Sequence, residues 1–211
     1  LQMWHQGVFS GFGGGSSVFA DRPRSVTAKA LMINTAYRYP LTQGGLSRFK
    51  QGWGMPDLTN LYNLRNKLTI VNETDLLQNA QTKFYPFNVN AGEPSIGFTM
   101  VYTDPAGSPA AAQARINDLS IRVTDPNGVT YWGNNGLAGG NWSVPGGAAD
   151  TINTVENVFV QNPVAGPWTL EVIGTSIVQD AHPQTAGVND AGYGLVVSSG
   201  VPDPSRPVYF Q

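Results

Sequence analysis

Short runs of β-branched and aromatic residues recur through residues 82–200, and several alternate with polar residues. Leu170 and Val172, for example, alternate with Thr169 and Glu171, which is the two-residue period of a half-buried strand. Clusters of Gly, Pro, Asn and Asp separate the runs. The pattern predicts strands over Phe84–Val89, Ile96–Tyr102, Leu119–Thr124, Val129–Trp132, Val155–Val160, Trp168–Ile173 and Tyr193–Ser198.

The clearest local signal is the sequence Asp125-Pro126-Asn127-Gly128. Alternating apolar residues flank it on both sides, as expected of a β-hairpin closed by a tight turn. Seven or eight antiparallel strands in about 120 residues are typical of a β-sandwich or jelly roll. The prediction is therefore a mainly β fold.

The first part of the chain has a different pattern. Ser25–Ile33 is the one convincing helix, with Ser25 as its N-cap and Val26, Ala30 and Ile33 on one face. Leu1–Gly7 resembles the last turns of a second helix, and the glycine-rich segment that follows is expected to form a loop. The sequence thus predicts an antiparallel jelly roll or sandwich preceded by a short helical, loop-rich segment.

The distribution of charged residues supports a division between the helical N-terminal part and the β-rich part of the chain. Residues 1–81 carry eight basic and four acidic side chains, whereas residues 82–200 carry three basic and nine acidic ones. We therefore place a domain boundary near residue 80, with domains 1–81 and 82–200 and an extended tail at 201–211. The chain begins with Leu1 and has no signal-peptide pattern, so we interpret it as a mature product or a fragment.

Composition excludes several classes of protein. Only 12% of the 211 residues are charged, the formal net charge is −2, and cysteine is absent. A nucleic-acid-binding protein would show a basic stripe, which is missing here. No run of 18 apolar residues predicts a membrane span, and cysteine-based metal or redox chemistry is excluded.

Several segments, in order along the chain, resemble secreted subtilisin-like serine proteases (subtilases). The resemblance covers most of residues 25–200 and implies the end of a catalytic domain followed by a C-terminal jelly roll. Residues 1–81 would then be a remnant of the catalytic domain. The segments are AKALMINTA at 28–36, QGWG at 51–54, VYTDP at 101–105, NDLSI at 117–121, VTDPNG at 123–128, DTINTVENV at 150–158 and PVAGPWTLEV at 163–172.

The residues that would make such a protein an enzyme do not match. By the resemblance, the chain starts inside or just after the helix that carries the family's nucleophile, and the regions with the catalytic Asp and His are missing. Gly174-Thr175-Ser176 spells part of the nucleophile motif, but it directly follows a predicted strand and is expected to start a turn. His5 and His182 anchor no convincing triad. We assign no catalytic residue to this chain, although the family consists of serine endopeptidases.

Jelly rolls of this family can bind calcium, which takes oxygen ligands from carboxylates and loops. The candidate ligands here are Asp104, Asn117, Asp118 and Asp125, although Ser120 stands where the family often has a second Asp. The alternative is that these side chains cap turns and the hairpin. Calcium is the one cofactor that we consider.

The sequence also contains two glycosylation sequons and a set of aromatic residues that could lie on the surface. Asn72 and Asn141 stand in formal glycosylation sequons, which matter only if the source glycosylates secreted proteins. Aromatic side chains could form a carbohydrate-binding platform, although core packing is the favoured interpretation. These side chains are Tyr102, Tyr131, Trp132 and Trp142.

The missing catalytic sheet leads to the functional hypotheses. Apolar residues near the N-terminus would lose their cover, and a large exposed apolar patch is rare on a monomer. One hypothesis is an extracellular structural subunit that self-associates head-to-tail into an oligomer or filament. The alternative is the C-terminal piece of a processed secreted subtilase, with the catalytic part on another chain; a free-standing carbohydrate-binding module is a weaker third. The proposed assembly residues are Met3, Trp4, Val8, Phe9, Phe12, Val18 and Phe19.

Overall fold

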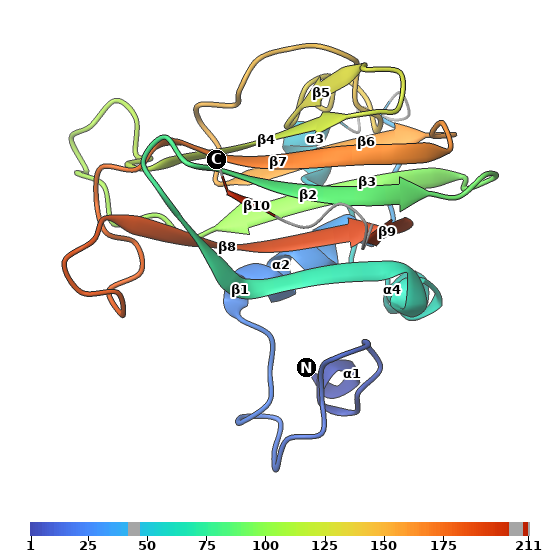
Figure 1. The fold of residues 1–211 in the computed structure, drawn as a ribbon, viewed down its shortest axis with the longest axis horizontal. Coiled ribbons are helices and arrows are strands. Elements are labelled where there is room, and N and C mark those ends of the chain that lie inside the picture. Colours follow the sequence, from blue (N-terminus) through green and yellow to red (C-terminus); the bar gives the residue numbers. More distant parts are fainter. Residues whose placement is uncertain (42–46, 203–208, 211) are drawn as a thin grey trace.

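The computed structural model describes residues 1–41, 47–202 and 209–210, and it is an antiparallel β-sandwich with a few short helices near the N-terminus (Figure 1). One sheet has the order β1-β8-β3-β6. The other has the order β10-β2-β7-β4-β5, and β9 also pairs with β2. The strands are β1 (Leu68–Gln78), β2 (Thr82–Val89), β3 (Ser95–Tyr102), β4 (Asp118–Thr124), β5 (Thr130–Trp132), β6 (Val155–Gln161), β7 (Gly166–Ser176), β8 (Asp190–Ser198), β9 (Gly200–Pro202) and β10 (Tyr209–Phe210).

The mainly β prediction is confirmed, and each of the seven predicted strands is present. The hairpin is also confirmed, because Val123 pairs with Tyr131 and Thr124 with Thr130 across the turn. Its turn is closed by Asp125, whose Oδ1 accepts hydrogen bonds from the N–H groups of Asn127 and Val129. These are the local contacts that make Asp a preferred turn residue.

Strand β1 was not predicted from the sequence. Its centre, Asn72-Glu73-Thr74-Asp75, is polar, and Glu73 has a positive φ of 56°. The pairing register with β8 shifts between Asn72 and Leu76, so β1 is irregular there. A strand with such an irregularity loses the two-residue alternation by which strands are recognised.

The main core lies between the two sheets. Phe87, Phe98 and Trp168 are almost completely buried there. The Trp168 ring stacks on Phe98 and on Tyr131, with ring centres 6.3 and 6.2 Å apart, and its Nε1 donates to the Val164 carbonyl over 2.8 Å. The indole therefore has both apolar cover and a hydrogen-bond partner.

A second layer covers the outer face of the β1-β8-β3-β6 sheet. The predicted helix is present as α2 (Ser25–Asn34), which lies along this face with Val26, Ala30 and Ile33 buried (Figure 1). Its N-cap is Arg24 rather than Ser25, and no side chain caps it, so the Ser25 prediction is wrong. The predicted helical turns near the N-terminus are present as α1 (Gln2–His5).

The close approach of helix and sheet depends on a glycine. A Cβ on Gly194 of β8 would lie 2.6 Å from the Thr27 nitrogen and 2.8 Å from its Cα, so any side chain there would push α2 away. With both faces covered, every residue of β8 is buried. The strand therefore shows the continuous burial of a strand between two layers.

Three short helical pieces complete the N-terminal part: α3 (Arg48–Gln51), α4 (Leu58–Leu64) and the 3-10 turn η1 (Arg65–Lys67). Asp57 caps α4 by accepting a hydrogen bond of 2.9 Å from the Asn60 nitrogen. No helix of the described residues is long and apolar enough to span a bilayer. Of the predicted tail, residues 203–208 and 211 lie outside the described residues.

Candidate functional site

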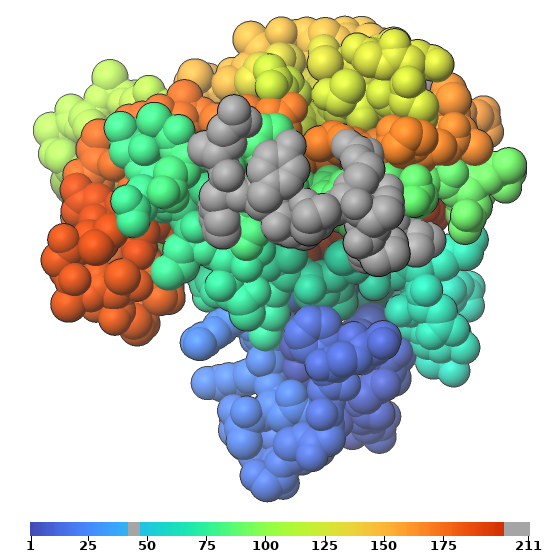
Figure 2. Space-filling model, viewed as in Figure 1, coloured from blue at the N-terminus to red at the C-terminus, as the bar shows by residue number. Residues whose placement is uncertain are grey.

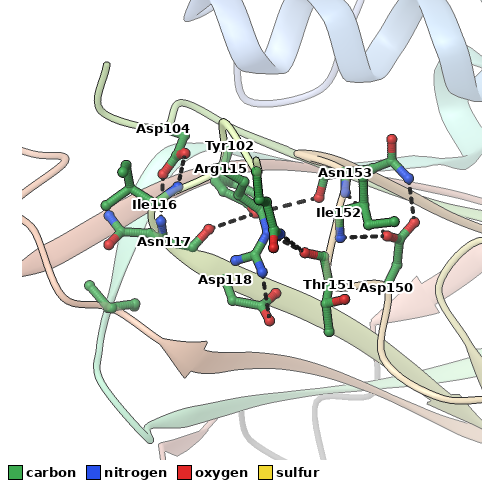
Figure 3. Close-up of polar contacts among 12 residues, drawn as sticks. Tyr102, Asp104, Arg115, Ile116, Asn117, Asp118, Asp150, Thr151, Ile152 and Asn153 are labelled. Atoms are coloured by element: carbon green, nitrogen blue, oxygen red, sulfur yellow. Dashed lines mark hydrogen bonds and ion pairs between the residues drawn. The ribbon is translucent and has the colours of Figure 1, made fainter. Parts of the chain in front are cut away.

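A buried polar cluster lies at the start of β4, where several of the sequence-predicted site residues meet (Figure 3). Asp104 accepts hydrogen bonds from the Ile116 and Asn117 nitrogens, at 2.6 and 2.8 Å. The side chain of Asn117 in turn bonds the backbone of residues 178 and 179. These two polar side chains thus fasten the β3–β4 loop and the β7–β8 loop to the beginning of the strand.

Asp118 and its neighbours carry the charge of this cluster. Arg115 Nη2 lies 3.3 Å from Asp118 Oδ2, while Asp118 Oδ1 has no hydrogen-bond partner. Burial raises the pKa of Asp118, an effect that Arg115 opposes and the nearby Asp150 reinforces. Burial would raise the pKa of Asp150 as well, but hydrogen bonds, first from Asn134 and Asn153, outweigh it and lower that pKa.

Glu156 on β6 is completely buried beside this cluster. Its Oε2 accepts a hydrogen bond of 2.8 Å from the Ile121 nitrogen, and its Oε1 has no partner. Burial raises the pKa of Glu156 well above its ordinary value, and the charges of Asp150 and Asp118 add to the effect. The cluster therefore favours a neutral, protonated Glu156.

The four proposed calcium ligands do not form one site. Asp104, Asn117 and Asp118 lie together, but Asp125 lies beyond the other end of β4, roughly 20 Å away at the usual rise per strand residue. Backbone N–H groups occupy the carboxylates of Asp104 and Asp125. In the part of the chain that the structure describes, no three His, Asp or Glu side chains are arranged to hold a metal ion. The set does not fit calcium, and turn capping accounts for two of its members.

The residues proposed for assembly differ widely in exposure. Trp4 and Phe9 are 3% exposed, and Trp4 packs on Phe12 with ring centres 4.2 Å apart. Met3, Val8 and Phe12 pack on the outer-face core formed with α2, Val18 is half-buried, and Phe19 is 77% exposed. The expectation that Trp4 and Phe9 lack cover is wrong, because both belong to a buried cluster with residues of α2 and of the β1-β8-β3-β6 sheet. Figure 2 shows the N-terminal part of the chain, in blue, below the sandwich.

Ser176, of the Gly-Thr-Ser sequence, and His182 both make contacts within the chain that do not form a catalytic triad. Ser176 is the last residue of β7 and pairs with Asp118, so the expected turn at this point is wrong. Nδ1 of His182 lies 3.3 Å from Thr185 Oγ1 and 3.9 Å from Asp190 Oδ1. Both contacts use the same ring nitrogen, whereas a triad needs one partner on each nitrogen.

The two asparagines of the glycosylation sequons and the four candidate sugar-binding aromatic residues are all at least partly buried or hydrogen-bonded. Asn141 donates through Nδ2, the atom that would carry a glycan, to the Tyr39 carbonyl over 2.8 Å. Asn72 is half-buried in β1, and its Oδ1 accepts from the Arg24 nitrogen. Tyr102 and Tyr131 are buried in the core, Trp132 is half-buried and Trp142 is 36% exposed, so these four aromatic side chains do not form one open platform.

Sequence reasoning missed the apolar surface of the short helices. Tyr37, Met55, Leu58 and Tyr62 are all about half exposed or more, at 48, 51, 69 and 50%. Tyr37 and Met55 pair through their backbones, and Leu58 and Tyr62 lie about one turn apart on α4. The spacing of Leu58 and Tyr62, four residues apart, was the available signal for one helix face.

No family model matches the chain. The serine protease/ABC transporter B family protein tagA of Dictyostelium discoideum is 27% identical over 188 residues, which cover 84% of this chain and 10% of that protein. The chain thus spans about a tenth of this relative.

Two solved structures match parts of this chain at low similarity. The propeptide form of Bacillus licheniformis lipase BlEst2 matches 63% of this chain and 21% of its own, with a TM-score of 0.33 and 16% identity. The Clostridium perfringens CspB protease matches 62% of this chain and 24% of its own, with a TM-score of 0.32 and 10% identity. What the comparisons establish, through the sequence match, is a distant similarity of this chain to a serine-protease-containing protein.

Proposed function

We propose that this chain is the non-catalytic C-terminal piece of a processed secreted subtilase-like serine protease, that the catalytic domain is on another chain, and that the helical side of this chain docks on that domain. The sequence match to a serine-protease-containing protein supports the association with proteolysis. The segments that resemble subtilases support the family. The single observation that carries the docking role is the exposure of four apolar side chains from α4 and from the paired residues Tyr37 and Met55. These side chains, Tyr37, Met55, Leu58 and Tyr62, are called the helical patch.

The helical patch differs from the rest of the described surface. Exposed hydrophobic side chains on the sandwich, such as Val144, Ile152 and Val178, come from separate loops. Those of the helical patch belong to α4 and the paired segments just before it. A grouped apolar surface of this kind marks an interaction site, whereas scattered exposed apolar residues are normal.

The sandwich supplies a rigid base for this surface. The helix α2 is held on β8 by close packing at Gly194, and α4 is tied to the chain after α2 by a hydrogen bond of 2.8 Å from Asn60 Nδ2 to the Thr35 carbonyl. A protease domain bound there would gain apolar burial. In return, the sandwich would stabilise that domain or help to position its substrate.

Native protein from the source organism tests the proposal. Immunoprecipitation with an antibody to this chain, followed by labelling with a fluorophosphonate probe, is expected to recover an active-site serine protease. The double variant Leu58→Ser, Tyr62→Ser should lose most of the labelled protease. The matched control Val144→Ser, Val178→Ser, which changes equally exposed apolar residues on the sandwich, should retain it. Absence of any labelled partner, or equal loss in both variants, would refute docking through the helical patch.

Self-association is a second candidate, favoured by Phe19 and Phe49, which are 77 and 95% exposed. Light scattering of the purified chain would then give a mass of several copies, and deletion of residues 1–15 would return it to a monomer. Because Trp4 and Phe9 are already covered within the chain, we rank this candidate below docking to a protease domain. A monomer that binds no protease would argue against both candidates.

A further inference from the structure

A cavity of about 220 Å³ lies where the end of α2, the helix α4 and the ends of β3 and β8 meet. Its lining includes Asn34, Arg38, Gly97, Phe159 and Ser198. At about 30 Å³ for each water molecule in the liquid, the space corresponds to about seven waters. It can hold a group of amino-acid size, but not a folded partner.

Arg38 is a cation in this cavity with few partners. Its guanidinium carbon lies 3.5 Å from the centre of the Phe159 ring, and its Nη2 donates one hydrogen bond, of 3.2 Å, to the Asn34 carbonyl. Its Nε is buried and has no acceptor. Among the described residues, no carboxylate forms an ion pair with Arg38. Burial lowers its pKa to about 10, and Arg48 adds to the effect.

Two other arginines of this chain have hydrogen-bond acceptors that Arg38 lacks among the described residues. Arg122 forms a two-point pair with Glu171, at 2.9 and 2.6 Å. Arg48 has no carboxylate either, but it donates to the carbonyls of Leu137, Gly52 and Gly140. A guanidinium has five N–H groups and binds carboxylates best through two of them at once. Arg38 alone of these three has most of that capacity unused.

Charge does not cancel within the cavity. Lys67 and Glu93, which also line it, pair with each other at 2.8 Å. The unbalanced charge is therefore that of Arg38, and it favours an anion. A bound anion would supply both the missing acceptors and the compensating charge that a partly buried cation requires.

A second unsatisfied group lines the same cavity. Asn34 is 4% exposed, and its Nδ2 donates to Thr99 and Val196, but its Oδ1 accepts no hydrogen bond. The cavity thus offers unused donors on Arg38 and an unused acceptor on Asn34. Both orphaned atoms are inaccessible to water in this structure, so binding requires the side chains of Arg38 and Asn34 to turn toward the ligand.

The space beside Asn34 exists because residue 97 is glycine. A Cβ on Gly97 would lie 2.9 Å from Ser198 Oγ and 3.2 Å from both Asn34 Nδ2 and a Phe159 ring carbon. Even an alanine would therefore narrow the cavity at its polar end. Gly97 has no positive φ in the structure, so its lack of a side chain, rather than backbone freedom, is what distinguishes the position.

We propose that this cavity binds a small carboxylate with an N–H donor next to it, as in an N-acyl amino acid or the last residue of a peptide. The carboxylate binds the guanidinium of Arg38 and the N–H faces Asn34. Ser198 supplies a further hydroxyl. No residue of the helical patch lines this site.

NMR titration of the ¹⁵N-labelled chain tests the proposal, because the Arg38 Nε–H resonance reports directly on the site. N-acetyl-alanine should shift it with saturable binding, whereas N-acetyl-alanine amide, which lacks the charge, should bind at least tenfold more weakly. A tripeptide ending in a free alanine carboxylate, compared with its amide, distinguishes a peptide end from a free amino-acid derivative. Equal binding of acid and amide, or no saturable shift with any acid, would overturn the proposal.

Variants locate the binding. Arg38→Gln should weaken N-acetyl-alanine at least tenfold, whereas Arg22→Gln, the same charge change at an exposed position outside the cavity, should leave affinity unchanged. If Arg38→Gln proves unfolded, Gly97→Ala serves instead: it fills the cavity without changing charge and should also weaken binding at least tenfold. Unchanged affinity in a folded Arg38→Gln or Gly97→Ala variant would contradict the site.

Discussion

The two faces of the β1-β8-β3-β6 sheet are covered in different ways. The inner face packs on a second sheet through large, almost completely buried side chains such as Phe98 and Trp168. The outer face is covered by α2 and by the folded-back N-terminal segment, in which partly buried Met3, Val8 and Phe12 pack around Trp4. The inner face makes a closed core. The outer face is assembled from short pieces that leave Phe19 and the helical patch exposed. Folding stability and partner binding are thus expected to depend on different sides of one sheet.

The largest expected effect is the loss of the inner core. Trp168→Ala should destabilise the chain by about 3–5 kcal/mol, because it removes a buried indole that stacks on two rings. Trp4→Ala, which removes an equally buried indole from the outer layer, should release the N-terminal segment while the sandwich stays folded. Urea unfolding combined with hydrogen exchange separates the two outcomes. Equal global destabilisation by both substitutions would show that the two faces form one cooperative unit.

The contact between helix and sheet gives the next effect. Gly194→Ala should cost about 1–3 kcal/mol, since the new Cβ meets the backbone of α2 rather than a side chain that can move. Gly139→Ala is the matched control, because a Cβ there meets nothing within 4 Å. Thermal unfolding measures both changes. A neutral Gly194→Ala would mean that α2 is only loosely seated on β8.

Glu156 and Asp150 are expected to change the stability of the chain with pH in opposite directions. The folded-state pKa of Glu156 is raised, so its contribution to stability is fully present below the unfolded-state pKa and is lost as pH rises through the folded-state value. Glu156→Gln should therefore gain stability relative to the natural chain as pH rises from about 4 to 8. Asp150, whose pKa is lowered, should show the opposite trend: Asp150→Asn loses most at high pH.

Unfolding midpoints check the sign when Glu156→Gln is compared with the natural chain from about pH 4 to 8, and Asp150→Asn from about pH 5 down to about pH 2, where the lowered pKa of Asp150 takes effect. A stability difference between the natural chain and Glu156→Gln that stays constant from pH 4 to 8 would show that Glu156 has an ordinary pKa.

The smallest effect on stability is expected at the helical patch. Leu58→Ser removes a side chain that is 69% exposed, so the free energy of unfolding should change by less than about 0.5 kcal/mol. Chemical denaturation of this variant and of the natural chain measures the difference. A loss above 1 kcal/mol would mean that Leu58 packs within the chain and that the patch is not a free surface.

Local patterns were sufficient for most of the sandwich. Seven strands and the Asp125 hairpin were predicted because β-branched runs and turn residues act over a few positions. The short elements α3, η1, β9 and β10 were not predicted, and neither were the two longer elements β1 and α4. Strand β1 is interrupted by a polar, irregular centre at Glu73, and α4 is short, although Leu58, Leu61 and Leu64 and the Asp57 cap were readable signals.

The candidate sites were harder to predict, because they depend on segments far apart in the chain. Asp104, Asn117 and Asp118 were predicted to lie together and do, whereas Asp125 does not, since a strand separates it from them. Arg38 gave no signal in the sequence. Its cavity joins residues from α2, β3, β6 and β8, and no local pattern records that a buried cation lacks an acid.

The sequence by itself thus determined the class of fold, the positions of seven strands and the absence of cysteine chemistry, because backbone propensity, side-chain alternation and composition are local properties. Only the tertiary structure decided which apolar residues need a partner. Trp4 and Leu58 are both apolar residues of short helices, and nothing in the sequence shows which of them is buried. The structure buries Trp4 within its own chain and leaves Leu58 exposed. Burial depends on what the rest of the chain places opposite a side chain, and that is fixed only when the distant segments pack together.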